Sequence, residues 1–254
     1  MRTPLLLAML LAATLTSCAA DEGEPSGPEQ LKLQVLEVLP HDPAAFTQGL
    51  ELAGDTLYEG TGLPGRSQLR AGPVAGPPQR AVTLPAPLFG EGITLVGPSV
   101  WQLTWQDGFA IERDAATLAE KRRVPYPGEG WGLCHQPGRG RLVMSDGTDR
   151  LTFRDPVTFA EVGAVTAPLD KLNELECVGD DVYANVWQTD RILRLDANGQ
   201  LTAEIDASGL LTAQEKAEAD VLNGIAAVPG TDQFLVTGKL WPKMFRVKLV
   251  PVQP

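Results

Sequence analysis

A short pattern occurs five times in this chain of 254 residues, and each copy carries a polar or aromatic residue at the same place. These residues are Gln48, Glu91, Trp131, Asn173 and Asn223, each followed by glycine except in the fourth copy, which has glutamate. A second set follows the last four of them by 14 to 16 residues and consists of Trp105, Asp146, Trp187 and Lys239. If the fold gathers both sets, they form a polar pocket walled by indoles, which is the usual form of a small-ligand site.

The same residues leave a second chemistry open. Carboxylate and carboxamide oxygens are calcium ligands, so Glu91, Asp146, Asn173 and Asn223 together would suit a metal-dependent lactonase or esterase. Three tryptophans and a lysine fit that site poorly, because a cation beside a bound metal ion is unfavourable. We therefore favour a pocket without a metal ion.

The spacing of the pattern indicates the fold that must position these side chains. Successive copies are 43, 40, 42 and 50 residues apart. Repeats of about 40–50 residues built from short strands are typical of a β-propeller, in which equivalent positions meet around one axis. We predict an all-β, five-bladed propeller over residues 31–250, with the five pattern residues at one mouth of its central channel.

Further strands are predicted within each repeat. Alternating apolar and polar residues indicate second strands at 56–60, 100–105, 141–145, 182–187 and 233–237, and third strands at 108–111, 150–154 and 191–195. The longer last spacing holds strong helix formers after Thr212, with Glu215 three residues later as in a capping box. We expect a short helix there, between the fourth and fifth blades. The N-terminal strand 31–38 would complete the fifth blade and close the ring.

The N-terminus has the features of an export signal. Arg2 precedes an apolar stretch from Leu5 to Leu15, and Cys18 follows in a sequence that resembles the lipobox of bacterial lipoproteins. We expect residues 1–17 to be a signal peptide, Cys18 to carry a lipid, and residues 18–30 to form a flexible tether. The protein would then be exported and lipid-anchored at the periplasmic or cell-surface face of a bacterial membrane. The alternative is an ordinary signal peptide with an unrelated cysteine.

Export also bears on the two other cysteines. Cys134 and Cys177 follow the pattern residues of adjacent repeats by 3 and 4 residues, so adjacent strands would bring them close. In an oxidising compartment they form either a disulfide or a pair of buried thiols.

The charge balance limits the partners. The formal net charge is −11 and no basic run occurs, which argues against a nucleic-acid partner. A closed ring without an obvious apolar edge favours a monomer.

Several longer motifs resemble those of the plant and bacterial glutaminyl cyclases. They are FTQGLE at 46–51, FGEGIT at 89–94, EGWGL at 129–133, LNELE at 172–176, NVWQTD at 185–190 and TGKLWPK at 237–243. The resemblance covers about residues 31–249. It implies a five-bladed propeller that converts the N-terminal glutamine of peptides into pyroglutamate and releases ammonia, without a cofactor.

The resemblance also implies roles for single residues. It places an essential carboxylate at Glu91 and substrate contacts at Phe46, Gln48, Trp105, Trp131, Asn173, Trp187 and Lys239. Glu91 would take a proton from the α-amine and deliver it to the leaving nitrogen, while Lys239, with Asn173 or Gln48, would stabilise the oxyanion. The assignment of Asn223 and Asp146 to the site follows from their position in the repeat alone. Cys134 and Cys177 depart from the family pattern. Besides the lactonase, a propeller that binds peptides without catalysis is the alternative.

Overall fold

The computed structural model describes residues 27–252, and these are almost entirely β-strand. The expected signal peptide, Cys18 and most of the expected tether lie outside the described residues. The first strand begins at Glu29, two residues inside the predicted tether, and the last one ends at Pro251. Among residues 27–252, no helix has the length and apolar character needed to cross a membrane.

Three of the sheets are four-stranded and antiparallel, and each follows the chain order of its strands. The first holds β2 (Thr47–Ala53), β3 (Thr56–Thr61), β4 (Gln68–Pro73) and β5 (Arg80–Thr83). The second holds β6 (Gly90–Val96), β7 (Ser99–Thr104), β8 (Phe109–Asp114) and β9 (Glu120–Pro125). The third holds β10 (Leu133–Gln136), β11 (Arg141–Ser145), β12 (Arg150–Arg154) and β13 (Glu161–Thr166), with a 3-10 turn at Pro137–Arg139.

The fourth sheet has eight strands in the order β14-β15-β16-β17-β1-β20-β19-β18. One half is β14 (Leu172–Val178), β15 (Asp181–Val186), β16 (Arg191–Leu195) and β17 (Leu201–Asp206). The other is β1 (Glu29–Pro40), β20 (Lys243–Pro251), β19 (Gln233–Gly238) and β18 (Leu222–Ala227). The predicted N-terminal strand thus completes the last group of strands by pairing antiparallel with β20. Its additional parallel pairing with β17, which joins the two halves, was not predicted.

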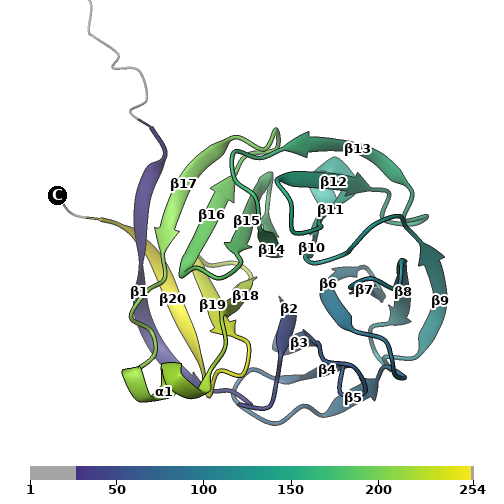
Figure 1. Cartoon of the computed structure of the whole chain (residues 1–254), viewed down its shortest axis with the longest axis horizontal. Coiled ribbons are helices and arrows are strands. Elements are labelled where there is room, and N and C mark those ends of the chain that lie inside the picture. The colour runs from purple at the N-terminus through teal and green to yellow at the C-terminus, as the bar shows by residue number, and fades with distance from the viewer. Residues whose placement is uncertain (1–26, 253–254) are drawn as a thin grey trace, which may run out of the picture.

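The strands are arranged around a common centre (Figure 1). The innermost strands are β2, β6, β10, β14 and β18, and each contacts the next, with β18 contacting β2. Glycines allow this approach: a Cβ on Gly92 would lie 2.6 Å from the carbonyl oxygen of Trp131, and one on Gly132 only 2.1 Å from that of Asn173. The glycine of the repeated pattern is therefore required by backbone packing at the centre.

The hydrophobic core lies between neighbouring groups of strands. Trp101, Tyr126 and Phe159 join the second sheet to the third. Leu39, Leu50, Leu57, Leu235 and Met244 join the last strands to the first. Burial of this apolar surface, together with the β1–β20 pairing, closes the ring of strands.

The predicted short helix is present as α1 (Ala213–Glu218), between β17 and β18. Thr212 is its N-cap, and the Thr212 hydroxyl accepts a hydrogen bond from the backbone N–H of Glu215. The Glu215 carboxylate in turn accepts one from the backbone N–H of Thr212, which completes the capping box. The structure also joins Cys134 on β10 and Cys177 on β14 in a disulfide between neighbouring innermost strands.

Glu174, which replaces the glycine in the fourth copy of the pattern, reaches across the centre. Its carboxylate accepts hydrogen bonds from the backbone N–H of Leu50 at 3.2 Å and of Ile225 at 2.8 Å. It thereby ties β14 to β2 and β18. Burial raises the pKa of Glu174 to about 8, although both N–H donors oppose the rise and the nearby Glu51 adds to it.

This raised pKa makes stability depend on pH. Between the ordinary pKa of glutamate and about 8, the unfolded chain has released the Glu174 proton while the folded chain keeps it. The free energy of unfolding therefore falls as pH rises through this window. One such carboxyl makes the free energy of unfolding fall by up to about 1.4 kcal/mol per pH unit, and we expect this contribution to be absent in Glu174→Gln. At pH 5 the variant is expected to be less stable than wild type, because one N–H loses its acceptor, and this difference shrinks as pH rises.

Urea unfolding between pH 5 and 8 measures both effects, with exposed Glu218→Gln on α1 as the matched control. A slope identical in wild type and Glu174→Gln would show that this carboxyl does not carry the proton.

Candidate active site

Four of the five pattern residues lie in β-bulges. The pairing register shifts between Thr47 and Gly49, between Gly90 and Ile93, between Leu172 and Leu175, and between Leu222 and Ile225. Gln48, Glu91, Asn173 and Asn223 occupy these shifts. A bulge takes a residue out of the regular ladder and re-aims its side chain, and bulges are frequent beside active sites. Trp131 differs, because it lies in the loop two residues before β10.

Gln48 connects two other pattern residues through its carboxamide. Its Nε2 donates to Glu91 Oε1 at 2.8 Å, and its Oε1 accepts from Asn223 Nδ2 at 3.2 Å. Asn223 Nδ2 also donates to the carbonyl oxygen of Thr47 at 2.9 Å. All three side chains are buried, so the network fixes the orientation of each amide and of the Glu91 carboxylate.

Three buried oxygens of the pattern residues have no hydrogen-bond partner in the structure. They are Glu91 Oε2, Asn173 Oδ1 and Asn223 Oδ1. A buried acceptor without a donor is costly, and in a native protein it calls for an explanation such as a ligand. A ligand rich in N–H groups, such as an amine or a carboxamide, would satisfy them.

Lys239 supplies the positive charge of the site. It is buried, and its Nζ lies 4.9 Å from the centre of the Phe46 ring. Burial raises the pKa of Glu91 well above its ordinary range, the Glu129 carboxylate adds to the rise, and the Lys239 charge opposes it. Burial lowers the pKa of Lys239, against the attraction of Glu91 and Asp220. A carboxyl with a raised pKa beside a lysine with a lowered one is suited to proton transfer near neutral pH.

Two aromatic groups wall the site. Trp131 and Trp187 meet edge to face with ring centres 5.5 Å apart. Phe89 packs edge to face against Phe46 at 6.1 Å and against Trp105 at 5.6 Å. Trp105 is the most open of the three predicted tryptophans, with 37 % of its surface exposed. It follows β7 directly and leads out of the cluster toward solvent.

Asn173 is fixed through its backbone. Its carbonyl oxygen accepts from Ser145 Oγ at 2.6 Å, and that hydroxyl accepts from the backbone N–H of Gly132 at 2.8 Å. Asn173 is thereby held next to the segment that carries Trp131. The structure thus connects the predicted residues Phe46, Gln48, Glu91, Trp105, Trp131, Asn173, Trp187, Asn223 and Lys239 through direct contacts or through the residues between them.

The hydrogen bonds of Asp146, which was assigned to the site from its repeat position, are local. Both of its hydrogen bonds go to Thr148, at 3.0 Å to the backbone N–H and at 2.6 Å to the hydroxyl. An aspartate that bonds the residue two positions later stabilises a turn. In residues 27–252, no three His, Cys, Asp or Glu side chains are placed to hold a metal ion together.

Two residues of the cluster were missed by the sequence argument for the site. Phe89 lies between Phe46 and Trp105 and is the last residue before β6. The Glu129 carboxylate accepts the indole N–H of Trp105 at 2.7 Å and that of Trp131 at 2.9 Å. Phe89 is the first residue of the FGEGIT motif and Glu129 is the first residue of the EGWGL motif, so the motifs themselves could have indicated both residues.

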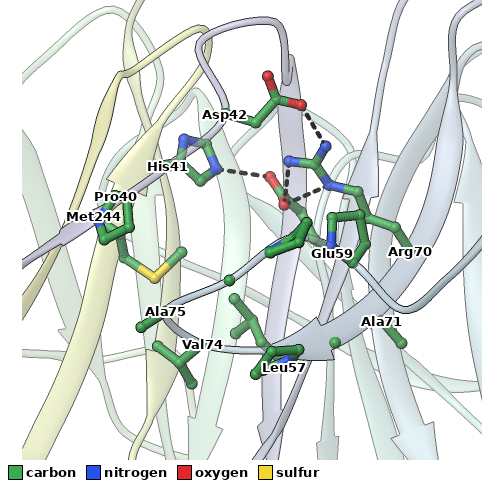
Figure 2. A pocket seen from close by; sticks show the side chains of 15 residues that line it. Pro40, His41, Asp42, Leu57, Glu59, Arg70, Ala71, Val74, Ala75 and Met244 are labelled. Carbon is green, nitrogen blue, oxygen red and sulfur yellow. Dashed lines mark hydrogen bonds and ion pairs between the residues drawn. The ribbon is translucent and has the colours of Figure 1, made fainter.

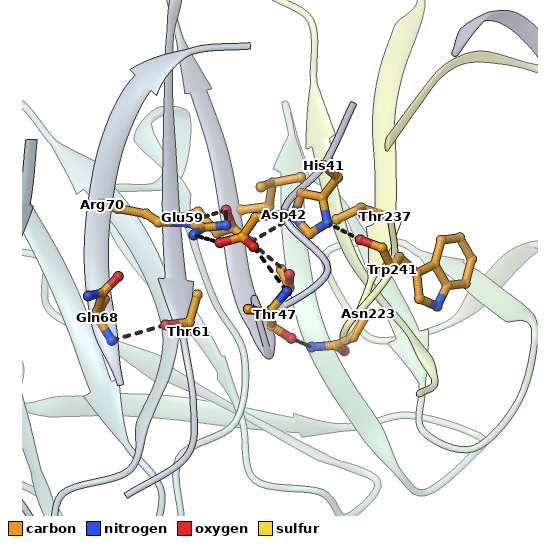
Figure 3. Close-up of polar contacts among 12 residues, drawn as sticks. His41, Asp42, Thr47, Glu59, Thr61, Gln68, Arg70, Asn223, Thr237 and Trp241 are labelled. Atoms are coloured by element: carbon orange, nitrogen blue, oxygen red, sulfur yellow. Dashed lines mark hydrogen bonds and ion pairs between the residues drawn. The ribbon is translucent and has the colours of Figure 1, made fainter. Parts of the chain in front are cut away.

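A buried group of charged side chains holds Thr47, the residue before Gln48 (Figure 3). Thr47 Oγ1 donates to Glu59 at 2.7 Å, and Glu59 is paired with His41 at 3.0 Å and with Arg70 at 2.7 Å. These three donors outweigh burial and hold the pKa of Glu59 at about 2. The group orients Thr47, whose carbonyl oxygen holds Asn223.

A cavity of about 450 Å³ lies against this group of charges (Figure 2). His41, Glu59 and Arg70 line one side of it, and Leu57, Val74 and Met244 line another. The charges facing the cavity are paired with each other, and Asp42 takes a further Arg70 N–H at 2.7 Å. Their role is therefore to stabilise the fold behind Thr47, in contrast to the unpaired oxygens around Glu91.

The geometry defines a class of site: an aromatic-walled cluster with one buried carboxyl, one buried lysine and free acceptors for a nitrogen-rich ligand. Comparison with known proteins agrees with a site for a ligand of this kind. Residues 6–249 match the family model described as glutamine cyclotransferase. A glutaminyl-peptide cyclotransferase of Arabidopsis thaliana is 38 % identical over 231 residues, which cover 86 % of this chain and 71 % of the plant protein.

A solved structure shows the same similarity in three dimensions. The crystal structure of the glutaminyl cyclase of Myxococcus xanthus matches with a TM-score of 0.80 and 37 % identity, over 89 % of this chain and all of that one. The chain belongs to the glutamine cyclotransferase family.

Proposed function

We propose that this protein is a glutaminyl-peptide cyclotransferase, which cyclises the N-terminal glutamine of peptides and proteins to pyroglutamate. The observation that carries the proposal is the set of unpaired buried oxygens on Glu91, Asn173 and Asn223, together with the Lys239 charge that acts on Glu91. An N-terminal glutamine offers an amine and a carboxamide, which are the N–H donors that these oxygens lack. Family membership and the two similar cyclases support the same reaction.

The chemistry needs one proton carrier. The α-amine nitrogen attacks the side-chain carboxamide carbon, so that a C–N bond forms and the C=O electron pair moves to oxygen. Ionised Glu91 accepts the proton that the attacking nitrogen loses and delivers it to the amide nitrogen. The C=O bond then re-forms, the old C–N bond breaks, and ammonia leaves with that proton. One carboxyl acts first as base and then as acid, for which a raised pKa suits it.

The other residues of the site position the substrate and stabilise the negative charge that develops on its carboxamide oxygen. Lys239 faces the developing oxyanion, with Asn173 or Gln48 as a further donor. The Gln48 and Asn223 amides match a neutral carboxamide, and therefore favour glutamine over glutamate. Trp105, Trp131 and Trp187 enclose the side chain and hold it in a conformation from which the amine can attack, which supplies much of the rate.

We further propose the finer architecture and the location. Five groups of four strands, with β1 as the fourth strand of the last group, constitute a five-bladed propeller. The Cys18 sequence supports a lipid anchor on the outside of a bacterial membrane, and we propose a monomer.

The test is ammonia release from a short peptide with N-terminal glutamine, with and without a metal chelator. The expected result is ammonia together with a peptide product lighter by one ammonia, at equal rates in both samples. Peptides with N-terminal glutamate should react far more slowly. Folded protein that binds the peptide without releasing ammonia would overturn the proposed function, and chelator-sensitive release would overturn the mechanism without a metal ion.

A further inference from the structure

Glu129 holds side chains of the site from two separate segments with one carboxylate. Its Oε2 accepts the indole N–H groups of Trp105 at 2.7 Å and Trp131 at 2.9 Å. Its Oε1 accepts the Gln106 side-chain amide at 2.8 Å. Trp105 and Gln106 follow β7, whereas Trp131 precedes β10, so the carboxylate bridges the second and third sheets.

The backbone around Glu129 is held without its side chain. The N–H of Gly130 donates to the carbonyl oxygen of Trp105, and the N–H of Trp131 donates to that of Ser145. All three hydrogen bonds of the carboxylate therefore go to side chains, two of which wall the site. An indole has only one donor, so the bond to Glu129 uses the whole polar capacity of each ring.

Trp105 depends most on this bond. More than a third of its surface is exposed, and Phe89 is the aromatic ring that packs against it. Without an acceptor for its N–H, a ring this exposed would sample other rotamers. Trp131 has Trp187 against one edge as a further support.

We propose that Glu129 is a positioning residue of the cyclisation site, which fixes the indoles of Trp105 and Trp131 as two walls around the substrate. This rests on the proposed function. Burial acts to raise the pKa of Glu129, but hydrogen bonds from Gln106, Trp131 and Trp105 outweigh it and keep this pKa below its usual value, so the carboxylate is ionised at neutral pH.

The charge of Glu129 has a second consequence. The charged and titratable groups that act on Glu91 are Lys239, which lowers its pKa, and Glu129, which raises it. Gln48 donates to it, and the buried Tyr126 hydroxyl also feels the Glu91 charge. Loss of the negative charge at position 129 makes the ionised form of Glu91 easier to form. The acidic limb of the kcat/KM profile then moves to lower pH.

Two variants separate the positioning of the two indoles from the effect of the Glu129 charge on Glu91. Glu129→Ala removes the acceptor and the charge, and we expect KM for a glutaminyl peptide to rise about tenfold. Glu129→Gln keeps one side-chain oxygen for the two indoles and lets Gln106 turn its own amide. We expect its KM to return near the wild-type value while its acidic limb stays shifted to lower pH. Glu120→Gln, an exposed glutamate paired with Arg123, serves as the matched control.

Acrylamide quenching of tryptophan fluorescence gives a readout that does not need turnover. Glu129→Ala should be quenched more strongly than wild type, and Glu129→Gln should lie close to wild type. If Glu129→Ala keeps wild-type quenching and KM, the proposal is wrong. A wild-type pH profile for Glu129→Gln would overturn the second consequence, that the charge of Glu129 acts on Glu91. Failure of wild type to release ammonia overturns the proposed function instead, and quenching still decides whether Glu129 fixes the indoles.

Discussion

Glu91→Gln is expected to lower kcat for cyclisation of a glutaminyl peptide by about 10³-fold, which is typical for loss of a general acid–base group. The amide fits the same space and can still accept the Gln48 hydrogen bond, but it cannot take a proton from the α-amine. Because the walls and the other polar groups are unchanged, Kd for the peptide should change by less than about tenfold.

Stopped assays of ammonia release give kcat, and isothermal titration gives Kd for the same peptide. Glu161→Gln, on the outer strand β13, controls for the loss of one negative charge. Turnover by Glu91→Gln within about tenfold of wild type would show that another group carries the proton.

Lys239→Met is expected to have the second largest effect. The methionine fills a similar volume, and the Phe46 ring can pack against it, but the positive charge beside Glu91 is gone. We expect kcat to fall by about 10²–10³-fold, as on removal of one oxyanion donor. Lys239 holds the pKa of Glu91 down, so its loss moves the acidic limb of the profile to higher pH.

This shift has the opposite sign to that expected for Glu129→Gln, and the pair tests the electrostatics of Glu91 from both sides. The matched control is Lys248→Met, a lysine that pairs with Asp232 at the surface. A Lys239→Met profile that moves to lower pH, or a kcat near that of wild type, would contradict the assigned role.

Much of the site could be predicted from spacing. Gln48, Glu91, Asn173 and Asn223 are equivalent positions of a repeat, and a repeat brings equivalent positions together. The glycine that follows is the visible trace of close packing at the centre, as Gly92 and Gly132 show. The bulges that aim these side chains leave no separate signal, because register emerges only when strands pair.

The features that could not be predicted from the sequence depend on contacts between separate segments of the chain. Glu129 is two residues from Trp131 in the chain, yet its bond to Trp105 requires the arrangement of two loops. Asp146 has the spacing of the other residues, but its hydrogen bonds go to Thr148 in its own turn, which spacing alone does not indicate. The parallel pairing of β1 with β17 likewise follows from ring closure and has no local pattern.

The most direct test of the central claim is a crystal structure of Glu91→Gln with a bound peptide that begins with glutamine. The α-amine is predicted to lie within hydrogen-bond reach of residue 91, with the carboxamide oxygen toward Lys239 and the rest of the peptide leaving past Trp105. A peptide bound in the cavity beside His41 and Arg70, or with its N-terminus away from residue 91, would contradict the account.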